Sequence, residues 1–61
     1  MTPAPRIRLH GNNHVTMERT PGGYAIRLYL NDRLEDKIRA DDYHLALEYW
    51  KAFNRIAKST T

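Results

Sequence analysis

Cysteine is absent from this chain of 61 residues, which excludes a disulfide framework and any thiolate metal site. Glycine is scarce, and its three positions, 11, 22 and 23, form no phosphate-binding loop. No apolar run approaches the roughly 20 residues that span a bilayer, and the first residues lack the apolar core of a signal peptide. These absences favour a soluble cytoplasmic protein with one small domain, near the lower size limit for a single hydrophobic core.

Catalytic and cofactor motifs are missing as well. Asp36 would be a general base if it were buried, but no nucleophile or second positioned carboxylate accompanies it. His10 and His14 flank a predicted turn, and two imidazoles facing across it would suit zinc, yet no cysteine or nearby carboxylate completes a tetrahedral set. We therefore expect a protein that is not an enzyme, with no metal, no cofactor and no small-molecule substrate.

Alternating apolar and polar residues predict four β-strands. The expected strands are residues 6–10, 14–19, 24–30 and 33–39, separated by turn-forming Gly, Asn, Asp and Pro residues at 11–13, 20–23 and 31–32. The third strand has the clearest alternation and is expected to be central, whereas the first is short and is expected at an edge. Asp36 falls on the apolar side of the last strand, which a bulge or a sheet edge would correct.

One helix is predicted from Asp41 to Lys58, where apolar residues recur at helical spacing. Asp41 or Asp42 is suited to cap its first turn. The first apolar stripe is Ala46, Trp50, Phe53 and Ala57, with Tyr43 and Leu47 beside it, and the second is Leu45, Tyr49, Ala52 and Ile56. We expect Trp50 and Phe53 in the core. The two stripes are wider than one sheet normally covers, so either the chain wraps around the helix or the second stripe meets a partner.

These elements predict an α+β fold, a three- or four-stranded antiparallel meander followed by one C-terminal helix packed on one face of the sheet (ββββα). The single domain is expected at residues 6–58. Residues 1–5 are expected to form a disordered tail and residues 59–61 a frayed one.

The opposite face of the predicted sheet is rich in basic residues. If the helix covers Val15, Met17, Tyr24, Ile26, Leu28, Leu34 and Ile38, strand periodicity turns the remaining positions outward, and these are Arg6, Arg8, His10, His14, Thr16, Glu18, Ala25, Arg27, Tyr29, Arg33, Glu35, Lys37 and Arg39. Only two of them are acidic. With Tyr29 near its middle, such a face can lie in a duplex groove or stack on bases. It predicts nucleic-acid binding, with DNA as the partner; a plain solvated sheet face is the alternative.

The segment from Gly22 to Trp50 resembles the amino-terminal arm-type DNA-binding domains of phage integrases. The shared features are Gly23 and Tyr24, the alternating strand with Arg27, a polar hairpin, a second basic strand, and Asp41 leading into Ala46 and Trp50. Those domains are similar in shape to plant AP2 domains, and they place a three-stranded sheet, backed by a helix, in the major groove. The resemblance implies that Arg27, Tyr29, Arg33, Lys37 and Arg39 face DNA, and Arg8 joins them on the outward side by periodicity. Integrases continue into catalytic domains that this chain lacks, so we expect binding without recombination.

A second hypothesis assigns the helix to protein binding. The stripe of Leu45, Tyr49, Ala52 and Ile56 has the composition of a protein interface. It would serve a homodimer, or a small inhibitor or adaptor acting on a host protein, for which the Arg-rich sheet is a further surface. Small cysteine-free chains of this kind suit a phage or mobile-element regulator, including one directed at a host defence complex. Membrane contact through the basic strip of the helix is not expected, because the sheet needs the helix as its cover.

Overall fold

The computed structural model of this protein describes residues 6–60 and contains four strands followed by one helix. The elements are β1 (Arg6–His10), β2 (Asn13–Thr20), β3 (Gly23–Leu30), β4 (Arg33–Ala40) and α1 (Tyr43–Ser59). The predicted ββββα order is therefore confirmed. The tail predicted at residues 1–5 lies outside the described residues, as does Thr61.

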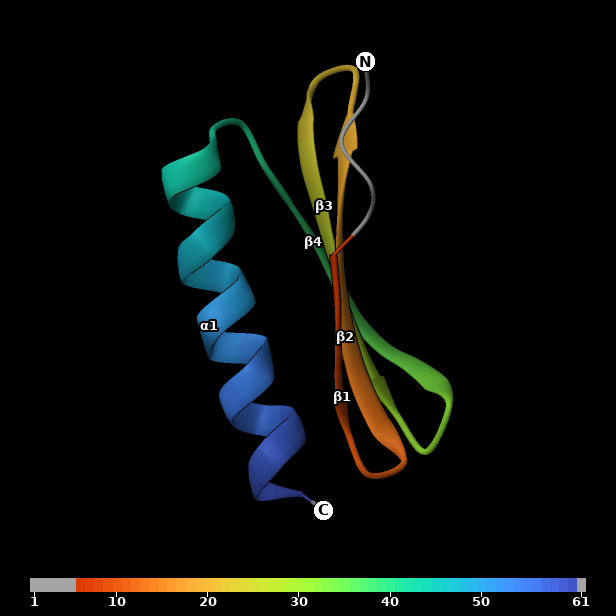
Figure 1. Cartoon of the computed structure of the whole chain (residues 1–61). Coiled ribbons are helices and arrows are strands. Elements are labelled where there is room, and N and C mark those ends of the chain that lie inside the picture. The colour runs from red at the N-terminus through yellow and green to blue at the C-terminus, as the bar shows by residue number, and fades with distance from the viewer. Residues whose placement is uncertain (1–5, 61) are drawn as a thin grey trace.

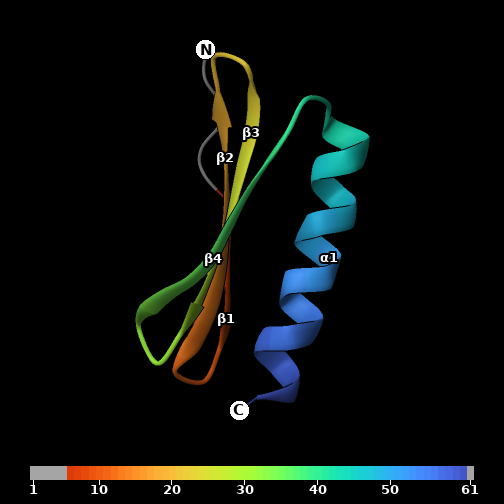
Figure 2. The same cartoon turned by 180° about the vertical axis from the view of Figure 1, so that it is seen from behind.

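The four strands form one antiparallel sheet in the order β1-β2-β3-β4, so β1 and β4 are the edges. The helix lies against one face, and the other face is left open (Figures 1 and 2). The sheet twists strongly, as antiparallel sheets do. Because of this twist, the β3–β4 hairpin leads away from α1, whereas the β1–β2 hairpin ends near its C-terminus (Figure 1).

Each hairpin is closed by a two-residue turn, because the paired positions that flank the turns are His10 with Asn13, Thr20 with Gly23, and Leu30 with Arg33. Asn31 and Asp32 have φ angles of 52° and 64°, the left-handed conformation that favoured hairpin turns need and that these two residue types tolerate. The prediction of this turn is confirmed. The first turn is shorter than predicted, since it contains Gly11 and Asn12 only.

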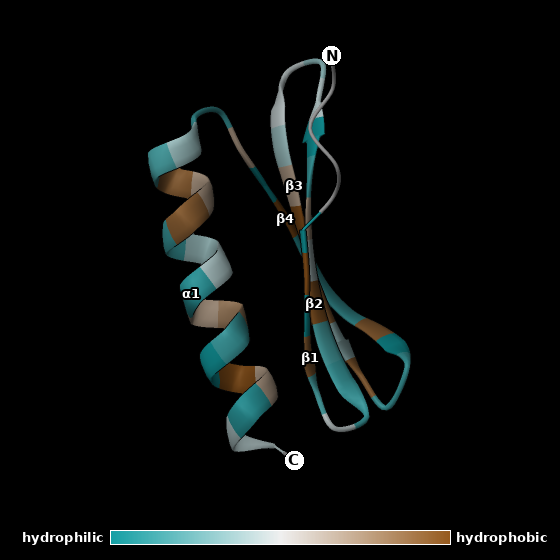
Figure 3. Ribbon diagram, viewed as in Figure 1, coloured by the Kyte–Doolittle hydropathy of each residue, from teal (hydrophilic) through white to brown (hydrophobic). Residues whose placement is uncertain are grey.

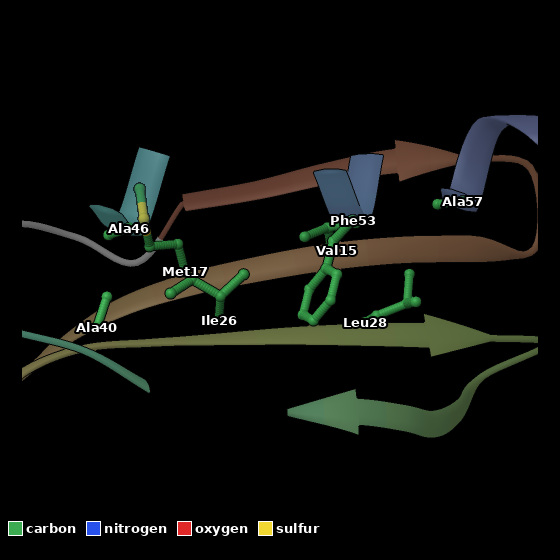
Figure 4. Close-up of a cluster of buried hydrophobic side chains, with 8 residues drawn as sticks. All are labelled: Val15, Met17, Ile26, Leu28, Ala40, Ala46, Phe53 and Ala57. Atoms are coloured by element: carbon green, nitrogen blue, oxygen red, sulfur yellow. The ribbon is translucent and has the colours of Figure 1, made fainter. Parts of the chain in front are cut away.

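The core lies between the helix and the two central strands. Val15 and Ile26 are fully buried, and with Met17, Leu28 and Phe53 of the helix they belong to one buried cluster (Figure 4). Ala46 and Ala57 are also buried, and their small side chains allow the helix to approach the sheet closely. Phe53 is in the core as predicted, whereas Trp50 is half-buried and packs at the margin of this cluster.

The helix begins and ends with defined caps. Asp42 is the N-cap, since its Oδ1 accepts a hydrogen bond from the Leu45 amide at 2.8 Å. At the other end, Thr60 is the C-cap, and its amide donates to the Ile56 carbonyl at 3.2 Å. Ser59 is thus the last helical residue, although the sequence predicts that the helix ends at Lys58 and frays from residue 59.

Gly23 has a positive φ of 146° at the point where the end of β4 passes over the β2–β3 turn. A Cβ atom at this position would stand 2.2 Å from the Ala40 carbonyl oxygen. A Cβ atom at the preceding Gly22 would meet only the end of the Arg39 side chain, at 3.3 Å. The chain therefore needs glycine at position 23 but not at position 22.

We predict that Gly23→Ala lowers the free energy of unfolding by about 2 kcal/mol or more, because it combines backbone strain with a steric clash. The matched control, Gly22→Ala, should change it by less than about 1 kcal/mol. Urea unfolding followed by far-UV circular dichroism measures both variants. Equal stability of the two variants would contradict this account of the turn.

Candidate binding surfaces

The side chains of β1 lie on the opposite sides from those predicted. Arg6, Arg8 and His10 were expected on the open face, but they lie on the helix side, where Arg8 is paired with the buried Val15. The Arg6 guanidinium donates to the Tyr43 hydroxyl at 3.2 Å and lies 5.9 Å from the centre of the Trp50 ring, within cation–π range. The prediction that β1 adds basic side chains to the open face is therefore wrong.

The two-residue turn explains this reversal. Residues opposite each other in an antiparallel pair project to the same side, so His10 must share the face of Asn13. Asn13 is buried on the helix side, where its Nδ2 donates to the Ala57 carbonyl at 3.0 Å. A three-residue turn, as predicted, shifts the strand by one position and inverts all its side chains. For the same reason His10 and His14 lie on opposite faces and do not face each other.

The open face consists of short rows of residues that run across the strands. The first row is Leu9, His14, Tyr29 and Leu34, the second is Ile7, Thr16, Arg27 and Lys37, and the third is Glu18, Ala25 and Arg39. Ile7, Leu9 and Leu34 are 60%, 72% and 54% exposed. The open face therefore combines an apolar and aromatic row with a group of cations displaced toward β3 and β4.

Two side-chain contacts organise the centre of this face. His14 and Tyr29 stack with ring centroids 4.4 Å apart and an interplanar angle of 12°. Because each ring covers a face of the other, the pair presents mainly ring edges and polar atoms to solvent. The Arg27 guanidinium donates to Glu18 Oε1 at 2.7 Å, which offsets part of the positive charge.

A bulge in β4 exchanges two residues between the faces. The register shifts between Leu28 and Tyr29 of β3, so that Leu34 lies opposite Tyr29 and Arg33 lies opposite Leu30. Leu34 is therefore exposed on the open face and not in the core as predicted. The β3–β4 hairpin accordingly carries a hydrophobic segment that leads away from the helix (Figure 3). Asp36 lies opposite the buried Leu28, so the bulge does not turn it to the open face. It is exposed because β4 is an edge strand, which was the second outcome expected for it.

The predicted nucleic-acid residues are thus divided between surfaces. Arg27, Tyr29, Lys37 and Arg39 gather on the open face, whereas Arg8 lies under the helix and Arg33 follows the register of the helix side. The predicted protein-binding stripe is exposed at Leu45, Ala52 and Ile56, while Tyr49 is half-buried and packs against the core.

A hollow of about 390 Å³ lies between α1 and the β1 edge, a feature that the sequence reading missed. It is lined by Arg8, His10, Trp50, Lys51, Asn54, Arg55 and Lys58. The spacing of Trp50, Asn54 and Lys58 places them on one stripe of the helix, and this could be read from the sequence. The position of Arg8 and His10 beside them could be predicted only with the correct register of β1.

Comparison with models of known protein families, with curated proteins and with solved structures finds no significant match for this chain. Across residues 6–60, no helix is long and apolar enough to cross a membrane. Within the same residues, no three histidine, cysteine or acidic side chains gather as metal ligands. Any functional conclusion therefore depends on the surfaces themselves.

Asn13 anchors the end of α1 through the hydrogen bonds that its side-chain amide donates, so the stability of the fold should depend on these donors. Asn13→Asp removes the donors to Ala57 and Thr60 and places a carboxylate against the Ala57 carbonyl, so the free energy of unfolding should fall by about 2–3 kcal/mol. Asn12→Asp changes the same chemical group at an exposed position and should have an effect below about 0.5 kcal/mol. Chemical denaturation compares the two, and similar losses would mean that Asn13 is not an anchor.

Proposed function

We propose that this protein is a non-enzymatic nucleic-acid-binding module that uses the open face of its sheet, with DNA as the partner. The observation that carries the proposal is the cluster of Arg27, Lys37 and Arg39 on adjacent strands. Arg27 and Lys37 are directly opposite each other. Like charges at opposed positions destabilise a sheet, and a polyanion laid on this face would offset that cost.

The dimensions of the face suit a duplex groove. Three strand spacings of about 4.8 Å place β1 and β4 about 14 Å apart, slightly more than the roughly 12 Å width of the major groove. The central strands can therefore approach bases while Lys37 and Arg39 of β4 reach phosphates. The edges of the Tyr29–His14 pair offer polar atoms to bases, and the flanking leucines suit apolar contact such as the thymine methyl group.

This use of the sheet also agrees with what the resemblance to arm-type integrase domains implies for Arg27, Tyr29, Lys37 and Arg39. Because Arg8 and Arg33 lie elsewhere, the proposed cationic contacts are limited to β3 and β4. A small binding module of this type suits a phage or mobile-element regulator that acts by occupying DNA.

We predict that labelled duplex DNA binds at low salt and that the logarithm of its affinity falls linearly with the logarithm of salt concentration. Lys37→Gln combined with Arg39→Gln should lower the affinity at least tenfold and reduce the salt slope by about 2, since each lost phosphate contact contributes about 0.9. Fluorescence anisotropy across a salt series gives both quantities.

The matched control is Lys51→Gln combined with Arg55→Gln, which removes one Lys and one Arg from the helix and not from the sheet face. Its duplex affinity should stay within about twofold of the unmodified protein, because a distant surface charge is largely screened. The proposal fails if no duplex binds at low salt, or if both double variants lose affinity equally.

A second candidate function is protein binding, which the exposed aliphatic residues favour. Ile7, Leu9 and Leu34 stand out on the open face, and Leu45 and Ile56 are 40% and 43% exposed on the helix. Exposed large apolar residues that recur along one surface mark protein contacts. The partner would be a second copy of the chain or a host protein bound by an inhibitor or adaptor.

Self-association is predicted to depend on only one of these two apolar surfaces. If the helix stripe carries it, Ile56→Arg should convert a dimer to a monomer in multi-angle light scattering, with an unfolding free energy changed by less than about 0.5 kcal/mol because Ile56 is exposed. Leu9→Arg is the matched change on the open face and should leave the dimer intact. The reverse result would assign the contact to the sheet, and a monomeric unmodified protein would exclude a homodimer.

A further inference from the structure

The hollow between α1 and β1 is lined by four basic residues, Arg8, Lys51, Arg55 and Lys58. None of the seven described residues that line it is acidic. The side chains of Arg8, Lys51 and Arg55 have no hydrogen bond or ion pair with any residue in 6–60. Glu48 lies one turn before Lys51 on the helix but forms no ion pair with it. The hollow is therefore an electropositive site in which several charged donors remain available.

The positive charges around the hollow repel one another. Lys51 and Arg55 are one helical turn apart, and like charges at that spacing destabilise a helix. Arg8 adds a third positive charge from the strand opposite. An anion bound among them would offset this repulsion, and a charge-assisted hydrogen bond to a guanidinium is stronger than a neutral one.

The floor of the hollow is fixed by a short hydrogen-bonded chain. Asn54 Nδ2 donates to the Trp50 carbonyl at 2.7 Å, which leaves the Asn54 Oδ1 as an acceptor for His10 Nε2 at 2.8 Å. The imidazole must then carry a proton on Nε2, and no residue within 6–60 forms a hydrogen bond with its Nδ1 atom. His10 is thus held in one orientation with one ring nitrogen available to a ligand.

Trp50 makes the hollow more than an anion site. Its indole is half-buried, and the Arg6 guanidinium lies above the ring at 5.9 Å from the ring centre. The Trp50 indole and the aliphatic stems of the basic residues give the hollow an apolar wall, and the charged ends of those residues form its rim. A simple inorganic anion would use only the rim, whereas a ligand with a flat ring and a phosphate would use both.

We propose that this hollow binds a nucleoside phosphate, with the phosphate among Arg8, Lys51 and Arg55 and the base against Trp50. Its volume of about 390 Å³ falls within the usual range for small-ligand pockets, about 300–1,000 Å³. Stacking on an aromatic side chain is favourable for any base, because every base has a flat aromatic face. The nucleotide is either free or part of a single strand, since both present the same chemistry. The site lies on the helix side and does not require the open sheet face to bind DNA.

Trp50 is the only tryptophan in the chain, so its fluorescence reports directly on this site. Adenosine 5′-monophosphate, adenosine, inorganic phosphate and a four-nucleotide single strand are titrated separately, with isothermal calorimetry as a second readout. We expect the monophosphate to change Trp50 emission and to bind at least tenfold more tightly than adenosine or inorganic phosphate. If only the four-nucleotide strand changes Trp50 emission and binds tightly, the ligand is a nucleotide within a single strand, and the proposed site is still supported.

The double variant Lys51→Gln with Arg55→Gln should weaken nucleotide binding at least tenfold, while Lys37→Gln with Arg39→Gln should change it less than twofold. Both pairs are exposed, and melting curves confirm that each variant is folded. The proposal is overturned if neither the monophosphate nor the strand binds, if adenosine binds equally well, or if both double variants weaken binding to the same extent. Duplex binding by the same variants tests the open face separately, so either site can fail without the other.

Discussion

The position of every β1 side chain depends on one buried carboxamide. Asn13 donates to the Ala57 carbonyl and the Thr60 hydroxyl, while its Oδ1 accepts from the Asn31 amide at 3.0 Å. This side chain thereby joins the start of β2, the β3–β4 turn and the end of α1. Because the turn before it has only two residues, His10 is brought to the same side as Asn13, and alternation then places Arg8 and Arg6 there as well.

The same constraint explains how a helix with so wide an apolar surface fits one sheet. On the flank facing β1, Arg6 contacts the Tyr43 hydroxyl and the Trp50 ring, and His10 contacts Asn54. Long arginine stems can cover apolar surface while their charged ends remain in water. On the other flank, Leu45, Ala52 and Ile56 receive no such cover and stay exposed. The charged side chains of Arg6 and Arg8 also discourage pairing of this edge strand with another copy.

Much of the fold was predictable because local patterns agree with it. The strand positions, the Asn31–Asp32 turn, the Asp42 cap and the burial of Phe53 follow from alternation, turn chemistry and helical spacing. The faces of β1 and of the start of β4 were not predictable with the same rules. A turn of Gly-Asn and a turn of Gly-Asn-Asn differ by one residue. That one residue decides which face of the sheet each β1 side chain occupies. The β4 bulge has the same effect on Leu34, and only the pairing of the strands reveals it.

Strand alternation also divides the basic residues into two groups that do not share a surface. Arg27, Lys37 and Arg39 belong to the open face, whereas Arg8 lies with Lys51 and Arg55 beside the helix. Trp50 packs against the core and Asn54 is hydrogen-bonded to His10 of β1, so changes at either residue would disturb packing and site together. Lys51 and Arg55 are exposed and contribute charge without packing. They are therefore the positions at which ligand binding can be separated from folding, because removing their charge leaves the docking of the helix intact.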